Sequence, residues 1–126
     1  MDGKVATAAD LGGIFKDCPG REIMKHLTGR WGGLILLALA KCDLRFHALR
    51  DRIEGISEKM LSQTLQLLVR DGLVSRSVRP TIPPEVSYGL TEMGREAARP
   101  LDAMVAFLHE RIEDVLAAQQ RYDAER

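Results

Sequence analysis

The 126-residue chain has little of what marks a membrane, secreted or disulfide-stabilised protein. It holds no run of about 18 apolar residues, the length at which a membrane-spanning helix becomes a candidate. Residues 1–15 lack the basic segment followed by an apolar segment that forms a signal peptide. The two cysteines, Cys18 and Cys42, are too few for a disulfide framework. We therefore expect a cytoplasmic protein with reduced thiols and no membrane partner.

The chain also lacks the residue groupings that catalysis and metal binding need. Its three histidines, His26, His47 and His109, fall in separate segments, and none lies at the spacing of a nucleophile and its base. The cysteines and histidines share no ligand-like spacing, and there is no glycine-rich phosphate loop. We expect no enzymatic activity, no metal and no cofactor.

A large net charge is absent as well, because 18 Lys and Arg balance 18 Asp and Glu. The charges are unevenly distributed, however: residues 41–95 are mildly basic and residues 96–126 are acidic. This asymmetry is compatible with DNA binding by the middle of the chain. The length fits one domain with a single hydrophobic core.

Apolar spacing predicts mainly helical structure. Residues 20–28, 46–53 and 58–71 carry apolar side chains at helical intervals, and residues 31–42 are apolar nearly all round, which predicts a helix in the middle of the core. Val74–Leu90 reads as a β-hairpin, with Pro83 and Pro84 in its loop. From Thr91 the pattern is helical again, and Pro100 predicts a new helix or a kink in a continuing one.

A short helix, a turn containing Gly55, a second helix and a hairpin follow one another as in winged helix-turn-helix proteins. In such proteins the second helix, here 58–71, enters the major groove of DNA; Ser57 is a suitable N-cap for it. On a helical wheel one side of this helix is buried and aliphatic, formed by Leu61, Thr64, Leu65 and Leu68. The opposite side carries Lys59, Ser62, Gln63 and Gln66, which we call the reading face, and Arg70.

The side chains of the reading face can hydrogen-bond base edges and phosphates. Alternatively, they simply solvate a surface helix, which is their usual fate. The turn before the helix and the hairpin after it favour the first interpretation. Four arginines at the edges of this unit can clamp the DNA backbone, although each can equally form a surface ion pair; Arg45 and Arg79 are the stronger candidates. The predicted DNA-binding residues are Arg45, Arg50, Ser57, Lys59, Ser62, Gln63, Gln66, Arg76 and Arg79.

A long apolar stripe follows Pro100 at helical spacing. It comprises Leu101, Met104, Val105, Leu108, Ile112 and Val115, and we call it the C-terminal stripe. Packing on the 31–42 helix can cover only part of it, so a second copy of the chain is the expected partner. Two-fold symmetry would also place two recognition helices about one turn of DNA apart.

Five short motifs resemble, in order, the pattern of the HxlR family of bacterial regulators. They are Cys18-Pro19, Gly29-Arg30-Trp31, Arg45-Phe46, residues 56–61 (ISEKML) and residues 83–91 (PPEVSYGLT). The resemblance covers about residues 18–116 and implies a winged-helix homodimer whose N- and C-terminal helices form the interface. It also implies binding to a pseudo-palindromic DNA operator. The expected organisation is an arm over 1–17, this domain over 18–116 and a polar tail over 117–126.

The chain departs from the family pattern at one position of the hairpin. The family commonly has a basic residue after the Pro-Pro pair, where this chain has Glu85. A carboxylate there would repel phosphate, so we expect the wing to contact DNA less closely, or only through Arg76 and Arg79.

The resemblance also suggests a signal. In part of the family the cysteine of the Cys-Pro motif senses electrophiles or oxidants, which implies a redox-sensing role for Cys18. Lys16, Arg21 and Lys25 lie near it in sequence and can favour its thiolate. The alternative is a small apolar residue buried at a dimer interface. Cys42 is interpreted as structural or incidental.

The sequence therefore predicts a dimeric DNA-binding transcription regulator, a repressor rather than an activator, with a small electrophile or oxidant as its effector. The alternative is a winged-helix module that contacts proteins and not DNA. The neutral net charge and Glu85 favour that alternative slightly, whereas the reading face disfavours it.

Overall fold

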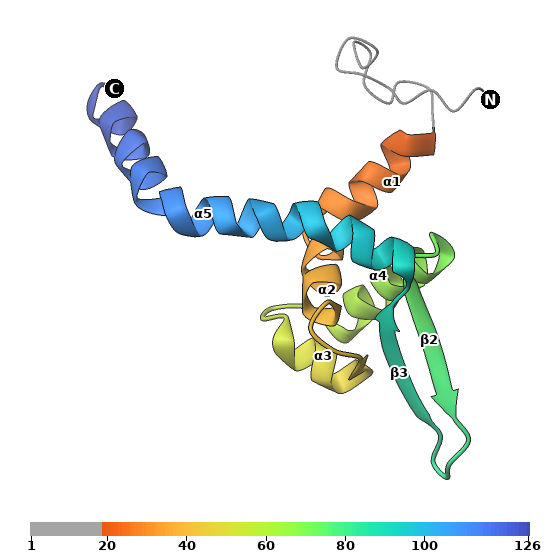
Figure 1. Ribbon diagram of the computed structural model, residues 1–126. Helices are drawn as coiled ribbons and strands as arrows, with labels where there is room; N and C mark the ends of the chain where they lie inside the picture. Colours follow the sequence, from red (N-terminus) through yellow and green to blue (C-terminus); the bar gives the residue numbers. More distant parts are fainter. Residues whose placement is uncertain (1–18) are drawn as a thin grey trace, which may run out of the picture.

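The computed structural model describes residues 19–126 (Figure 1). The predicted arm over 1–17 and Cys18 lie outside the described residues. Within this part of the chain, five helices and three short strands follow in the order α1 (Pro19–Thr28), α2 (Gly32–Leu39), β1 (Leu44–Arg45), α3 (Phe46–Arg52), α4 (Glu58–Arg70), β2 (Val74–Arg79), β3 (Glu85–Leu90) and α5 (Glu92–Ala124). The predicted fold class, a mainly helical winged helix-turn-helix with a small hairpin, is confirmed.

The core lies where α2, α3 and α4 meet, and α2 passes through its middle as predicted. Fully buried aliphatic side chains come from all three helices, among them Ile35, Leu49 and Leu65. The helix is not covered all round, however, because the Leu34 side chain keeps 46% of its surface exposed. One side of α2 therefore remains apolar and accessible.

Local signals set the two helices of the helix-turn-helix unit. Gly55 lies between them with φ of +90°, a conformation that costs glycine little. The Ser57 hydroxyl accepts a hydrogen bond from the Met60 backbone N–H at 3.0 Å and so caps α4. An ion pair between Arg50 of α3 and Glu58 in the first turn of α4 joins the two helices. Together these contacts fix where α4 begins.

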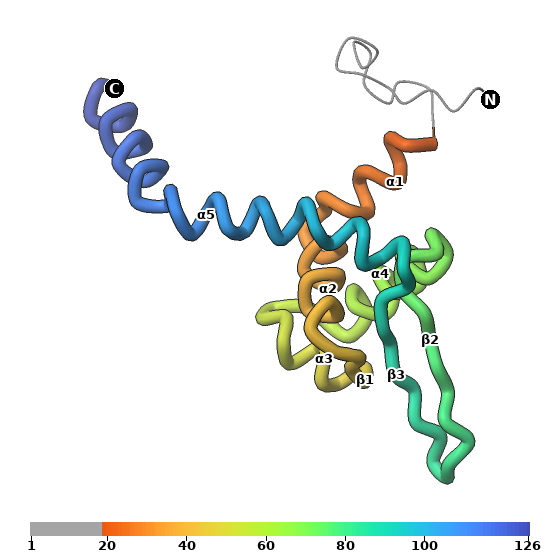
Figure 2. Tube along the Cα trace, in the orientation of Figure 1, coloured from red at the N-terminus to blue at the C-terminus, as the bar shows by residue number. Residues whose placement is uncertain are grey.

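The sheet has three strands in the order β1-β3-β2, and the hairpin of β2 and β3 extends away from the helices (Figure 2). Strand β1 was not predicted, because two residues are too few to show an alternating pattern. It places Leu44 opposite Tyr88 and Arg45 opposite Ser87. The short strand thereby brings the start of α3 to the base of the wing.

The interpretation that a new helix begins at Pro100 is wrong. Helix α5 runs unbroken over 33 residues with Pro100 inside it, and it continues past the predicted domain boundary at 116. Pro100 is exposed, so its ring points away from the core, and the missing N–H removes only one hydrogen bond of a long ladder. The clear bend of α5 lies further toward the C terminus (Figure 1). Across residues 19–126, no helix has both the length and the apolarity to cross a membrane.

A polar pair with largely buried side chains ties α1 to the end of α4. His26 Nδ1 lies 2.6 Å from an Asp71 carboxylate oxygen, and the two side chains are only 8% and 9% exposed. Asp71 is the C-cap residue of α4. Separating such a pair would leave a buried polar group unsatisfied, at a cost of about 1–3 kcal/mol. The N-terminal helix α1 is therefore held against the C-terminal end of α4.

Candidate nucleic-acid interface

Helix α4 has one buried and one exposed face, divided as its apolar spacing predicts. Leu61, Leu65 and Leu68 are at most 1% exposed and pack into the core. Thr64 is half-buried, and its hydroxyl donates to the Met60 carbonyl at 2.8 Å. On the other side Lys59, Gln63 and Gln66 are exposed. The apolar face thus fixes the direction in which the polar side chains project.

The reading face is continuous along the helix. Ser62 and Gln66 lie one turn apart, and Gln66 Nε2 donates to the Ser62 hydroxyl over 3.4 Å. Lys59 lies one turn before them, near the positive end of the helix dipole. The Ser57 hydroxyl caps α4 by accepting from the Met60 N–H, so a structural role is sufficient to explain a serine at this position. Its DNA-binding role stays a prediction.

Three of the four predicted arginines are engaged by carboxylates. Arg45 lies 2.9 Å and Arg79 lies 3.5 Å from the same Glu85 oxygen, so Glu85 joins the base of the wing to its outer part. Arg79 and Glu85 are direct cross-strand partners, which explains their contact. Arg50 pairs with Glu58. Within residues 19–126, Lys59 and Arg76 form no ion pair.

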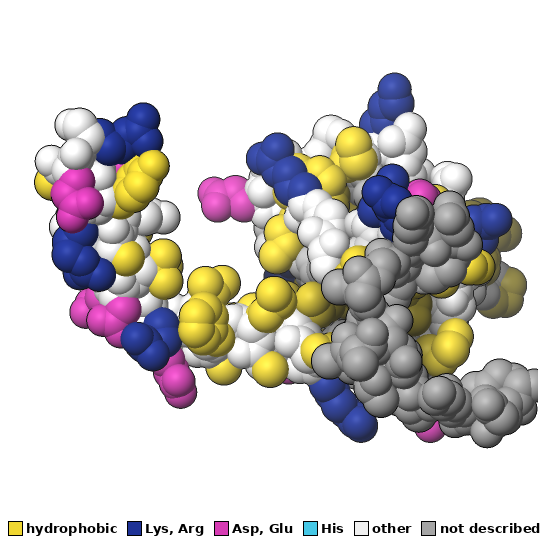
Figure 3. Space-filling model, turned by 90° about the horizontal axis from the view of Figure 1, so that it is seen from above, with side chains coloured by type: hydrophobic (Ala, Val, Ile, Leu, Met, Phe, Trp, Pro, Cys, Tyr) yellow, Lys and Arg dark blue, Asp and Glu magenta, His cyan; other side chains and the backbone are white. Residues whose placement is uncertain are grey.

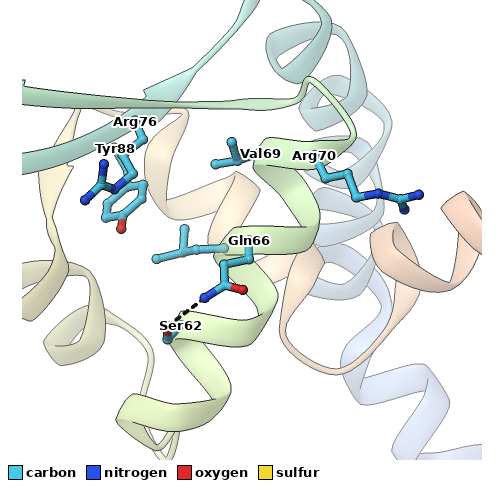
Figure 4. A pocket seen from close by; sticks show the side chains of 7 residues that line it. Ser62, Gln66, Val69, Arg70, Arg76 and Tyr88 are labelled. Atoms are coloured by element: carbon cyan, nitrogen blue, oxygen red, sulfur yellow. Dashed lines mark hydrogen bonds between the residues drawn. The ribbon is translucent and has the colours of Figure 1, made fainter.

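Sequence reasoning missed Tyr88. It lies opposite Arg76 across the hairpin, and both side chains line a hollow between α4 and the strands (Figure 4). Pairing the residues of the predicted hairpin by register would have revealed this neighbour, because the positions 74–79 and 85–90 match one to one. Tyr88 also packs against the core, which is the role its half-buried ring suggests first.

Helix α5 leaves a large apolar surface uncovered. Met104, Leu108 and Ile112 of the C-terminal stripe are 61%, 47% and 43% exposed. The first part of the stripe borders an apolar groove with Leu27, Leu34 and Leu37. Figure 3 shows hydrophobic side chains along α5. Phe107 is also exposed, although it was not among the predicted stripe residues.

Of the two cysteines, the structure describes only Cys42. Cys18 lies outside the described residues. Cys42 is an exposed free thiol just after α2, so it is not a buried structural residue.

Comparisons with known proteins agree with this geometry. Residues 26–115 match the family model for HxlR-like helix-turn-helix proteins. An HTH-type transcriptional regulator of Escherichia coli, YtfH, is 43% identical over 109 residues, which make up 86% of each chain.

Two solved structures extend the likeness to the fold. The transcriptional regulator YtfH from Salmonella typhimurium is 42% identical with a TM-score of 0.78, covering 83% of this chain and 94% of that one. The redox regulator HypR in its oxidised form is 30% identical with a TM-score of 0.68, covering 74% and 96%. With its helix-turn-helix, wing and matched sequence, the chain belongs to the HxlR-like helix-turn-helix family of transcriptional regulators.

Proposed function

We propose that this regulator binds a pseudo-palindromic DNA operator as a homodimer and represses the adjacent gene. The observation that carries the proposal is α4, which buries an aliphatic face and projects Lys59, Ser62, Gln63 and Gln66 from a helix-turn-helix unit. Glutamine can pair with adenine through two hydrogen bonds, and lysine can contact guanine or phosphate. The reading face is therefore suited to the major groove.

The wing adds a weaker electrostatic contribution. Arg76 carries a charge that no described residue neutralises, whereas Glu85 holds Arg45 and Arg79. A phosphate would have to compete with Glu85 for these two arginines. Glu85 therefore limits the affinity of the wing for DNA phosphates. With few arginines available to phosphates, the chain is poorly suited to tight binding of DNA of unrelated sequence.

The apolar groove beside α5 supports the homodimer. A monomer would leave the exposed stripe residues and the Leu34 side of α2 in water, whereas a second copy would bury them. A two-fold dimer would present two reading faces to two half-sites. The alternative function, protein contact without DNA, is favoured by the neutral net charge and by the engagement of Arg45 and Arg79 by Glu85.

Substitutions on the reading face test DNA binding. Gln63→Ala should weaken binding to the DNA upstream of the protein's own gene about tenfold or more, while binding to unrelated DNA should change little. Lys59→Ala should weaken binding to both. Fluorescence anisotropy at several salt concentrations measures these affinities. Gln119→Ala, on exposed α5, is the matched control.

If the wild-type chain binds neither DNA even at low salt, the DNA-binding proposal is wrong. The protein-contact alternative then becomes the better explanation.

Glu85→Gln should raise DNA affinity. The substitution frees Arg45 and Arg79 and removes a carboxylate near the phosphates, which together are worth about 1 kcal/mol, or roughly fivefold. The slope of log affinity against log salt should also become steeper. Glu96→Gln makes the same change of charge on exposed α5 and should have no effect. Equal affinities for the Glu85 variant and the wild type would show that the wing tip does not contact DNA.

Leu108→Glu should dissociate the dimer, because two carboxylates would be buried in the apolar interface. Light scattering after size exclusion should then give the mass of one chain, 14.0 kDa, instead of twice that. Ala106→Glu puts the same group on the opposite side of α5 and should leave the dimer intact. A Leu108→Glu protein that remains dimeric would place the interface elsewhere.

Cys18 is proposed as the sensor of electrophiles or oxidants, supported by its Cys-Pro motif and by the likeness to the redox regulator HypR. Diamide should change the operator affinity of the wild type and of Cys42→Ser, but not that of Cys18→Ser. Anisotropy with and without diamide, followed by reduction, measures this. An unaltered diamide response in Cys18→Ser would rule out the sensor role.

A further inference from the structure

A hollow of about 400 Å³ lies between α4 and the wing strands (Figure 4). Its apolar floor is formed by Leu65, Val69 and the ring of Tyr88. Polar groups surround this floor: Ser62 and Gln66 from α4, and Arg76 from β2. Arg70 also contributes to the lining, but Figure 4 shows its side chain directed away from Tyr88 and Arg76.

The strand register explains why Arg76 and Tyr88 face this hollow together. They are Cα partners across the hairpin, so their side chains lie on the same face of the sheet. Val74 and Leu90, two residues further along each strand, share that face and are buried beside the core. The pair is therefore held next to α4 by the packing of its own strands.

Both side chains keep hydrogen-bond donors available. Among the hydrogen bonds and ion pairs formed within residues 19–126, none involves the Arg76 guanidinium or the Tyr88 hydroxyl. Asp and Glu are absent from the residues that line the hollow. The opening is thus surrounded by the Arg76 guanidinium, the Tyr88 phenol and the Ser62 hydroxyl. No carboxylate in the lining neutralises the charge of Arg76. This arrangement suits an anionic oxygen ligand.

The position of the hollow indicates which anion would come closest to it. Ser62 and Gln66 belong both to its lining and to the reading face. A helix lying in the major groove has a sugar-phosphate backbone at its flank, and here that flank is the hollow. Arg76 is also the wing arginine that Glu85 does not engage.

We propose that this hollow binds a backbone phosphate of the operator, with Arg76 and the Tyr88 hydroxyl as the donors. Tyr88 then contacts DNA through its hydroxyl and packs against the core through its ring. The contact sets the register of α4 in the groove and carries no base information of its own. The proposal rests on the proposed function, since it requires that the chain bind DNA.

The test uses the full chain and two duplexes of equal length, one from upstream of its own gene and one of unrelated sequence. Tyr88→Phe, which removes only the hydroxyl, should weaken binding to both duplexes by the same factor, roughly tenfold for each half-site, since the lost bond is to a charged group. Arg76→Gln should weaken both and reduce the salt slope by about 0.9 for each half-site, or about 1.8 for a bound dimer. Tyr122→Phe and Arg121→Gln, both on exposed α5, are the matched controls and should bind as the wild type does.

Uncharged methylphosphonate groups placed one at a time along the operator locate the contact. At one position per half-site the uncharged group should weaken binding of the wild type strongly and binding of Arg76→Gln little. The variant already lacks the guanidinium that contacts this phosphate, so removing the phosphate charge costs it little more. Far-ultraviolet circular dichroism checks that Tyr88→Phe is folded; if it is not, Arg76→Gln and the methylphosphonate series decide the question.

The outcomes separate this proposal from the proposed function. If the wild type binds operator DNA and Tyr88→Phe binds it equally well, the phosphate contact is wrong and DNA binding stands. A loss confined to the operator sequence would also overturn it, since it would indicate a base contact. If the wild type binds neither duplex at low salt, both proposals fail.

Discussion

The burial of one face of α4 is the constraint on which the rest of this structure depends. Leu61, Leu65 and Leu68 are removed from water in the hydrophobic core, where α2 and β2 pack against α4. At about 1.5–3 kcal/mol for each buried leucine, this burial exceeds any surface interaction of the helix. Because the side-chain positions of a helix are rigidly related, burying these three leucines also sets the direction of Lys59, Gln63 and Gln66. The surface that faces outward is thus determined by what packs inward.

Most of the fold could be predicted from the sequence because its signals are local. Ser57 and Gly72 mark the ends of the recognition helix, and the proline pair marks the loop of the wing. What escaped prediction depends on neighbours distant in the chain. Strand β1 exists only because β3 pairs with it, and α5 tolerates Pro100 because an exposed position accepts the ring. The contact between Glu85 and Arg45, forty residues earlier, depends on the pairing of β1 with β3, which no local pattern shows.

The charges of the candidate interface are arranged so that few are freely available. Glu85 engages Arg45 and Arg79, Glu58 engages Arg50, and the whole chain is formally neutral. Because non-specific DNA affinity scales with the number of phosphates that are neutralised, such a surface has little tendency to bind DNA of every sequence. If the glutamines of the reading face contact bases as proposed, these contacts make up a larger share of the affinity, which favours discrimination between sequences over general attraction.

The largely buried side-chain contact between His26 and Asp71 has a mechanical consequence. It connects an N-terminal helix, which has no part in the reading face, to the C-terminal end of the recognition helix. A displacement of α1 therefore either pulls that end of α4 along or separates two groups shielded from water, at about 1–3 kcal/mol. Small movements of α1 are therefore expected to move the end of α4 with them. A movement of α1 that supplies more free energy than the His26–Asp71 contact contributes would break the contact and leave α4 in place.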